Sequence, residues 1–341
     1  MIANSQPSCG RQAVLALGGG GARGLAHFGA AQAVYESGIQ VQRVVGISIG
    51  SLAGAMLAQD LPPVDVQREL LRYLASDDFG SKQASLFGTQ TTGGRANSGL
   101  LGWYDQIKSY LWARHLLGRV FRRRSLLPGG VLEQVIAALV PDIDISDLPV
   151  PLSIAAVDLK SGHSIVLERG PLRRAIAASA AIPGIFPPVE WEGMLLCDLG
   201  VLDSLPTEVA RSYASDLVIG VDVGPTLSRD ERCESALHVL LRMDEIGERL
   251  LRRYSLRRAD ILMQPNVGHC PWFDFGNAQR MIESGYDAGR CAIQRWLRTQ
   301  PREGHTIAGG IAHRVNGHRA TSPTQSAGLS SLLHDERCVE D

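Results

Sequence analysis

A serine flanked by glycines is the residue of this chain whose setting best suits covalent chemistry. Gly46, Ile47, Ser48, Ile49 and Gly50 form a Gly-x-Ser-x-Gly sequence that follows an apolar run of strand length and precedes a run of small residues. In such a strand-to-helix corner the hydroxyl is exposed and the N-terminus of the following helix lies beneath it. The glycines two positions before and after the serine face each other, where a Cβ would crowd the turn. The pattern predicts that Ser48 is a nucleophile.

A glycine-rich corner precedes this serine in the chain. It consists of Gly19, Gly20, Gly21, Ala22, Arg23 and Gly24, which follow the apolar run at 13–17. Consecutive backbone amides of a glycine loop that opens a helix bind anions, and the intermediate of acyl transfer is an oxyanion. The two corners together outline a hydrolase site.

A serine hydroxyl needs a base that takes its proton, and the chain offers three carboxylates for that role. Asp158, Asp198 and Asp222 each follow an expected strand, at the edge where open α/β sheets carry their sites. Spacing does not choose among them, and each also suits the capping of a loop.

The nine histidines lie in no recognisable triad sequence. Five lie in the C-terminal tail or in a basic segment: His115, His305, His313, His318 and His334. The other four are His27, His163, His238 and His269. His27 follows the glycine loop on an expected helix, a place more typical of a packed structural histidine than of a base.

The remaining pattern alternates strands and helices. Expected strands lie at 149–157, 164–167, 194–197 and 217–221, and expected helices at 172–181 and 206–214. Strands that are apolar on both faces and separated by helices are typical of a mostly parallel sheet covered on each side. The fold class is therefore predicted as α/β, a three-layer α/β/α sandwich with a mostly parallel central sheet.

Length and composition set the broader expectations. We predict a short polar extension at 1–12, one domain at 13–298 and a disordered tail at 299–341. With 34 Lys and Arg against 35 Asp and Glu, no overall charge attracts nucleic acid. The six cysteines form no CxxC pair, which favours reduced thiols. No secretory signal or run of spanning length is recognised, so a cytoplasmic location is expected, with peripheral contact at the inner membrane face left open.

Four motifs in order resemble those of the patatin-like phospholipase family, particularly its short bacterial members. They are the glycine loop at 19–24, the serine corner at 46–50, the run at 178–188 and Asp198-Leu199-Gly200. The resemblance covers about residues 14–296. It implies a patatin-like fold without metal or organic cofactor, a Ser-Asp dyad of Ser48 and Asp198, and an oxyanion hole at 19–24. The implied reaction is hydrolysis of a lipid ester, phospholipid or lysophospholipid, through an acyl-enzyme.

One position departs from the family pattern. Leu199 stands where a glycine usually follows the aspartate, before Gly200. If that position needs a positive φ, leucine strains the backbone and turns Asp198 away from Ser48. The alternative is then a catalytically weak protein that binds lipid or a partner. A dinucleotide-binding reading of the glycine loop is a third hypothesis, but no acidic residue ends the second strand, where Gly46 to Ser48 stand instead.

Two further segments bear on access to lipid. Trp103 to Arg124 combines aromatic and basic residues, which suits either a membrane-interfacial helix or a core-packed helix with a solvated basic face. With the Gly- and Thr-rich stretch before it, this part of 82–130 is a candidate flap or lid. His238 to Arg258 reads as a surface helix or a subunit contact, with membrane contact the minor alternative. The oligomeric state is not predicted.

Overall fold

The computed structural model of the chain describes residues 10–87, 125, 127–200, 202–225, 236–268 and 270–300. Most of the candidate flap, all of Trp103 to Arg124 and the tail from 301 onward lie outside the described residues. Residues 82–87, the first of the expected flap, form the end of a helix.

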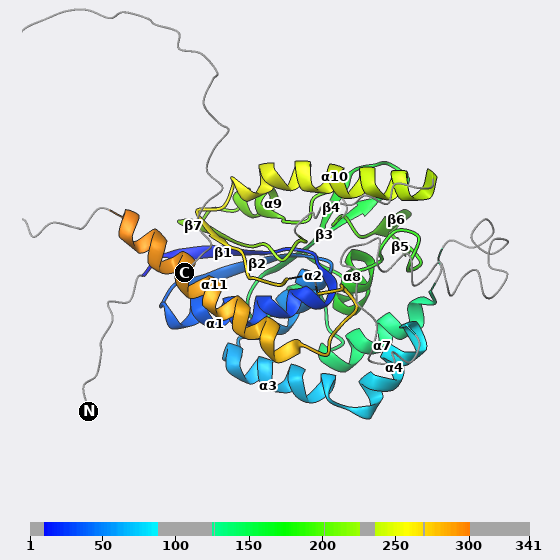
Figure 1. The fold of residues 1–341 in the computed structure, drawn as a ribbon, viewed down its shortest axis with the longest axis horizontal. Coiled ribbons are helices and arrows are strands. Elements are labelled where there is room, and N and C mark those ends of the chain that lie inside the picture. The colour runs from blue at the N-terminus through cyan, green and yellow to red at the C-terminus, as the bar shows by residue number, and fades with distance from the viewer. Residues whose placement is uncertain are drawn as a thin grey trace, which may run out of the picture. The chain divides into compact units, whose positions relative to one another are not determined.

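An eight-stranded sheet forms the centre of the described chain (Figure 1). Its strands are β1 (Gln12–Leu17), β2 (Gln40–Ile47), β3 (Leu152–Asp158), β4 (Ser164–Leu167), β5 (Val189–Trp191), β6 (Met194–Cys197), β7 (Leu217–Val221) and β8 (Ile261–Met263). The order is β5-β6-β3-β2-β1-β7-β8, with β4 paired to β3. The pairs β3-β2, β2-β1, β1-β7 and β7-β8 are parallel, whereas β3 pairs antiparallel with β4 and β6, and β5 pairs antiparallel with β6. The mostly parallel sheet is confirmed, with an antiparallel end that the strand-helix alternation did not predict.

Helices cover both faces of this sheet. They are α1 (Ala26–Glu36), α2 (Ile49–Leu57), α3 (Pro63–Leu74), α4 (Asp77–Phe87), α7 (Gly129–Leu139), α8 (Leu172–Ser179), α9 (Thr207–Arg211), α10 (Ala236–Leu256) and α11 (Ala278–Thr299). Figure 1 shows α1, α3 and α11 below the sheet and α9 and α10 above it. The three-layer α/β/α prediction is confirmed.

Strand β1 shows how the sequence produces these layers. Alternate side chains of a strand point to opposite faces, and all of β1 after Gln12 is buried. Leu15 and Leu17 belong to the large core shared with α1, α2 and α11, while Val14 and Ala16 pack in the smaller cluster with α9. A strand covered on both faces must be apolar throughout, which is why its sequence is a continuous apolar run.

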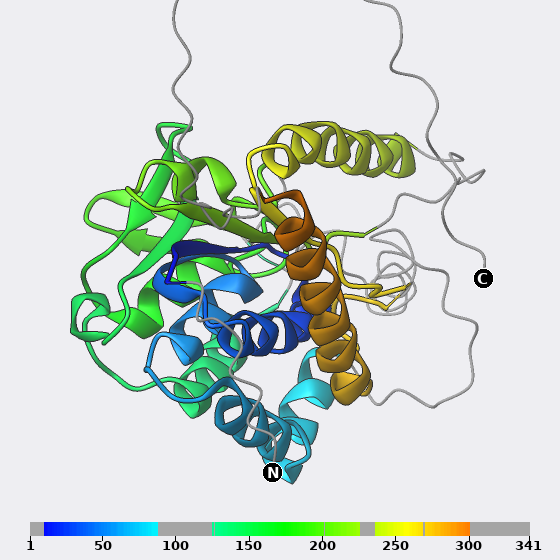
Figure 2. The ribbon, with the colours of Figure 1, turned by 90° about the vertical axis from the view of Figure 1, so that its left-hand side faces the viewer.

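Close packing of α11 on α1 fixes the first helix (Figure 2). A Cβ at Gly29 would lie 1.8 Å from the Ile282 carbonyl oxygen, and one at Gly285 would lie 1.9 Å from that of Ala26. Only glycine permits backbones to approach so closely. The small residues of α1 therefore hold the end of the glycine loop against the body of the domain.

Candidate active site

Ser48 lies at the corner between β2 and α2, in a backbone conformation that few residues adopt. Its φ is 56°, and holding a non-glycine residue in such a region costs on the order of 1–3 kcal/mol. A Cβ on Gly46 would lie 2.4 Å from the Gly50 carbonyl oxygen, and one on Gly50 would lie 2.2 Å from that of Leu17. The predicted glycine requirement at this corner is thus met by the geometry.

Two other serines hold this corner in place. The Ser48 amide donates to Ser179 Oγ at 2.9 Å, and Ser179 Oγ donates to the Ala155 carbonyl at 2.7 Å. Ser51 Oγ donates to the Ser48 carbonyl at 2.6 Å. Ser179 had no role in the sequence analysis. Its signal was a single hydroxyl at the end of a helix whose last turns are apolar, and the role of such a residue depends on which group it contacts in the fold.

Strand register brings Asp198 to the level of Ser48. Ile47 pairs with Ala155, and Val157 pairs with Cys197 in the antiparallel sense. If each register is continued by one residue, Ser48 and Asp198 both reach the level of Ala156 on β3. Because β6 runs against β3, its carboxyl end points back toward the serine corner instead of away from it.

The Asp198 carboxylate is buried and accepts a hydrogen bond from the Gly200 amide at 2.7 Å. Burial raises the pKa of Asp198 to about 6, although interactions with the Ser48 side chain and the Gly200 amide act to lower it. A carboxylate with a raised pKa is a stronger base than an exposed one.

The other two candidate carboxylates serve structural roles. Asp158 accepts from the Leu195 amide at 2.8 Å and from Ser161 Oγ at 2.7 Å, and these hydrogen bonds help lower its pKa to about 2. Asp222 pairs with Arg252 at 3.4 Å. Of the three carboxylates, Asp198 is the one whose pKa is affected by the Ser48 side chain, and its role as base stays a prediction.

His27 is a packed structural residue, as its sequence position suggested. It is fully buried, and its Nε2 lies 2.8 Å from the Gly18 carbonyl oxygen. Burial lowers its pKa to about 4, so the ring is neutral and donates from Nε2. Of the other candidate histidines, His163 is exposed, whereas His269 and the side chain of His238 lie outside the described part of the structure.

The glycine loop passes beside Ser48. A Cβ on Gly19 would lie 3.5 Å from Ser48 Cβ, and one on Gly24 would lie 2.4 Å from Ile49 Cγ2. The amides of Gly19 and Ala22 donate to the carbonyls of Ser204 and Trp272, at 2.9 and 2.5 Å. Within the described chain, the amides of Gly20 and Gly21 have no such acceptor. Fewer amides of residues 19–24 are therefore available to bind an anion than the sequence predicted, because those of Gly19 and Ala22 already donate to backbone carbonyls.

Arg23 holds the loop instead of lining the pocket. Its Nε donates to the Gly20 carbonyl at 3.1 Å, and burial lowers the pKa of the guanidinium to about 10. This contact turns the Gly20 carbonyl toward Arg23. The sequence left open whether this side chain fixes the loop or contacts a substrate, and the structure shows the first.

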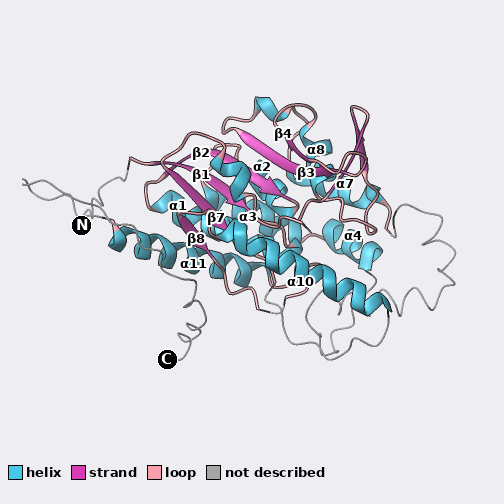
Figure 3. Cartoon of the chain, turned by 90° about the horizontal axis from the view of Figure 1, so that it is seen from above, coloured by secondary structure: helices cyan, strands magenta, loops and turns pink. Residues whose placement is uncertain are grey.

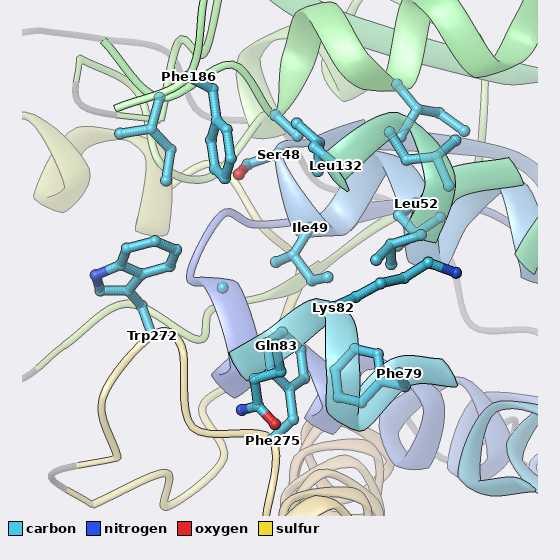
Figure 4. Close-up of a pocket in the computed structure, with 16 residues that line it drawn as sticks. Ser48, Ile49, Leu52, Phe79, Lys82, Gln83, Leu132, Phe186, Trp272 and Phe275 are labelled. Atoms are coloured by element: carbon cyan, nitrogen blue, oxygen red, sulfur yellow. The ribbon is translucent and has the colours of Figure 1, made fainter. Parts of the chain in front are cut away.

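An apolar pocket of about 120 Å³ opens beside Ser48 (Figure 4). Its lining is mainly aliphatic and aromatic: Gly21, Ser48, Ile49, Leu52, Phe79, Lys82, Gln83, Leu132, Val135, Ile136, Ile176, Ala180, Ile182, Phe186, Trp272 and Phe275. Figure 4 shows Ser48 beside Phe186 at one end and Phe79 and Phe275 at the other. Such a lining suits an alkyl chain.

Leu199 causes no backbone strain. Its φ is negative, since the described non-glycine residues with positive φ are Ser48, Asp60 and Glu192. The side chain is buried in an apolar cluster that includes Ile47 and Phe186. The concern that leucine would turn Asp198 away is therefore wrong, because the Asp198 carboxylate still interacts with the Ser48 side chain.

A buried polar network connects α10 to the glycine loop. Arg252 lies 3.6 Å from Glu248 and 3.4 Å from Asp222. Glu248 accepts from Ser204 Oγ at 2.5 Å, and the Ser204 carbonyl is the acceptor of the Gly19 amide. The loop is thus braced from the opposite face of the sheet.

Comparison with known proteins agrees with this arrangement of motifs. A family model described as patatin-like phospholipase matches residues 15–211, more than half of the chain. The chain belongs to the patatin-like phospholipase family. The match contains Ser48, Asp198 and the whole glycine loop.

Relatives of this patatin-like chain are longer proteins. An uncharacterized NTE family protein of Mycobacterium tuberculosis is 32% identical over 217 residues, which cover 61% of this chain and 48% of the relative. Human patatin-like phospholipase domain-containing protein 6 is 27% identical over 319 residues, 85% of this chain and 21% of that protein. VipD from Legionella pneumophila is similar in structure with a TM-score of 0.46, at 16% identity over 86% of this chain and 68% of VipD. The chain spans about half the length of the mycobacterial relative and about a fifth of the human one.

The described residues also bear on membrane-spanning helices and on metal sites. None of the described helices has the length and apolar character needed to cross a bilayer. No cluster of three His, Cys, Asp or Glu side chains that could hold a metal ion was found in the same part of the chain.

Proposed function

We propose that this protein is a serine acyl hydrolase that cleaves fatty acyl esters of lipids, phospholipids or lysophospholipids, with Ser48 as nucleophile and Asp198 as general base. The observation that carries the proposal is the interaction of the Ser48 side chain with a buried Asp198 whose pKa is raised, at the end of an apolar pocket. A family of lipid hydrolases supports the substrate class.

The reaction would proceed in two halves. Ser48 Oγ attacks the ester carbonyl while its proton passes to Asp198, and the carbonyl oxygen becomes an oxyanion. The C–O bond to the alcohol then breaks, and the alcohol leaves with the proton from Asp198. Water attacks the acyl-enzyme, gives its proton to Asp198, and the fatty acid leaves as Ser48 regains its proton.

The oxyanion would be held by the amides of Gly20 and Gly21. Gly21 lines the pocket, and both amides are without a protein acceptor in the described structure. A preorganised donor of this kind contributes about 10²–10³-fold in rate. The acyl chain would lie along Ile49, Leu52 and Phe79, which line the pocket.

A fluorophosphonate probe tests the proposal, because it reacts only with an activated serine. Wild type should be labelled and should hydrolyse both a p-nitrophenyl ester and phospholipid vesicles, whereas Ser48→Ala should do neither. If wild type is neither labelled nor active but binds lipid, the alternative of a catalytically weak binding protein is correct.

The segment at 82–130 completes the proposal. We retain the hypotheses that it acts as a flap or lid and that Trp103 to Arg124 contacts a membrane peripherally, from the cytoplasmic side. The aromatic and basic composition of this segment supports the contact. Deleting 103–124 should reduce hydrolysis of vesicles while short soluble esters are still cleaved.

A further inference from the structure

Helix α10 departs from the pattern of an ordinary surface helix at the side chains that the structure describes, which leave out those of 236–238, 240 and 241. A surface helix normally turns its apolar stripe to the core and its charges to water. Among the described side chains of α10 the buried one is Arg252, next to Glu248. The exposed side chains include Val239, Met243 and Tyr254, at 45%, 60% and 71% exposure.

The inward charged face is fully committed to pairing. Arg252 contacts Asp222 and Glu248, and it donates to the Pro225 carbonyl at 2.7 Å. Arg242 pairs with Glu245 at 2.9 Å, and both side chains are largely buried. Turning the helix to bury its apolar stripe would break these pairs and leave charges without partners, which is strongly unfavourable. The apolar stripe is therefore held outward.

The outward side chains form one continuous stripe. Val239, Met243, Leu250 and Tyr254 are separated by 4, 7 and 4 residues, so they share a helix face. The stripe extends about 22 Å along the helix at 1.5 Å per residue, and Leu251 widens it at 46% exposure. An exposed apolar surface of this extent indicates an interaction site.

Charges beside the stripe indicate the kind of partner. Arg253 and Arg257 are exposed and Arg249 is half-buried, against the single exposed acidic residue Asp244 on the N-terminal half of the described helix. Arginines beside an apolar helix face attract anionic lipid headgroups. A ring with a polar tip, such as that of Tyr254, suits the boundary between headgroups and acyl chains.

We propose that the outer face of α10 docks on an anionic lipid surface, with Val239, Met243, Leu250 and Tyr254 at the acyl boundary and Arg249, Arg253 and Arg257 at the headgroups. This docking is independent of the chemistry at Ser48. Figure 3 shows α10 lying lengthwise along the outside of the domain.

The docking helix is also the one that braces the glycine loop. Glu248 faces inward from α10 to Ser204, whose carbonyl accepts the Gly19 amide. A surface that binds α10 therefore contacts the helix that is connected to the glycine loop through Glu248 and Ser204.

A second copy of the chain is the competing occupant, and it matches the charges less well. Two antiparallel α10 helices would offer the three arginines of each copy only one exposed carboxylate, that of Asp244. An anionic bilayer offers a phosphate group to each of the three arginines.

Vesicle flotation of the full chain in a Ser48→Ala background tests the proposal. The vesicles are phosphatidylcholine alone or an equal mixture with phosphatidylglycerol. The Ser48→Ala chain with α10 unchanged should float with vesicles of the mixture and more weakly with vesicles of phosphatidylcholine alone. Leu250→Ser with Tyr254→Ser should weaken binding to the mixture about tenfold, and Arg253→Gln with Arg257→Gln about fivefold for each charge removed.

Matched controls remove similar apolar surface elsewhere. Leu159→Ser and Tyr35→Ser change residues at 53% and 63% exposure in a turn and on α1, and they should bind as the parent does. Melting curves report whether each variant folds, and the arginine pair provides a second reading that removes no apolar side chain. Equal binding by parent and both α10 variants would overturn the proposal. So would a dimer that Leu250→Ser with Tyr254→Ser dissociates while no form binds vesicles.

Discussion

The side chain of Ser48 interacts with the buried carboxylate of Asp198 and acts to lower its pKa. An ordinary aspartate, with a pKa near 3.8, is too weak a base to take a serine proton readily. Burial outweighs the effect of Ser48 and raises the pKa of Asp198 to about 6, which brings it nearer to the pH at which an enzyme works. In the mechanism that we propose, the low exposure of this carboxylate strengthens it as a base.

Asp198→Asn should reduce the rate of ester hydrolysis by about 10²–10⁴-fold, because the amide cannot accept the proton of Ser48. The side chain keeps its shape and an oxygen for the Gly200 amide, so the fold should persist. Steady-state hydrolysis of a p-nitrophenyl ester measures the loss.

The matched control is Asp158→Asn, at another buried aspartate that follows a strand. This carboxylate faces Leu195 and Ser161 instead of Ser48, so the variant should lose stability and keep its rate within a few-fold. Equal losses of rate in both variants would contradict the assignment of Asp198 as base.

The pH dependence of kcat/KM should follow the ionisation of Asp198. The carboxylate acts as a base only when deprotonated, so activity should rise with pH up to about 6 and then level off. Below that value it should fall about tenfold per pH unit. His27 has a pKa lowered to about 4, so His27→Gln should leave the position of this inflection unchanged. An inflection near 6.5 that disappears in His27→Gln would assign the base to the histidine.

Stability should move in the opposite direction to activity. Because the folded-state pKa of Asp198 is raised above 3.8, the protonated carboxyl favours the folded state below pH 3.8, and this contribution is lost as pH rises through about 6. The difference corresponds to on the order of 3 kcal/mol. Asp198→Asn carries no such charge and should be more stable than wild type at pH 8. Urea unfolding at pH 8 and pH 4 should show this advantage shrinking at the lower pH. If Asp198→Asn is less stable than wild type at pH 8, the ionised Asp198 carboxylate does not destabilise the folded state.

Several parts of this site could be predicted from sequence because they depend on local backbone geometry. The Gly46-x-Ser48-x-Gly50 corner and the glycine loop are recognised by the glycines within them. Strand β1 is recognised by its continuous apolar run. Asp198 could be singled out only by family resemblance, since its place beside Ser48 depends on β6 running antiparallel to β3. Nothing within residues 194–198 states that direction.

Contacts between distant elements were beyond sequence analysis. Ser179 and Glu248 matter through partners 131 and 44 residues away. The direction in which α10 faces was also missed. Its pattern of apolar and basic residues is compatible with either face turned inward, and the pairing of Arg252 with Asp222 decides between them.

Substitutions at Leu199 test whether this departure from the family motif strains the backbone. The order of stability of two variants gives the answer. With a negative φ and a buried side chain, both Leu199→Ala and Leu199→Gly should destabilise the fold by about 2–5 kcal/mol through the lost packing. Leu199→Gly should be the less stable of the two by about 0.5–1 kcal/mol, since glycine adds freedom to the unfolded chain. If this position required a positive φ, the order would reverse. Because the Asp198 carboxylate interacts with the Ser48 side chain although leucine stands at position 199, neither variant should hydrolyse esters faster than wild type. A gain of activity in Leu199→Gly alone would show that leucine restrains the site despite its unstrained backbone.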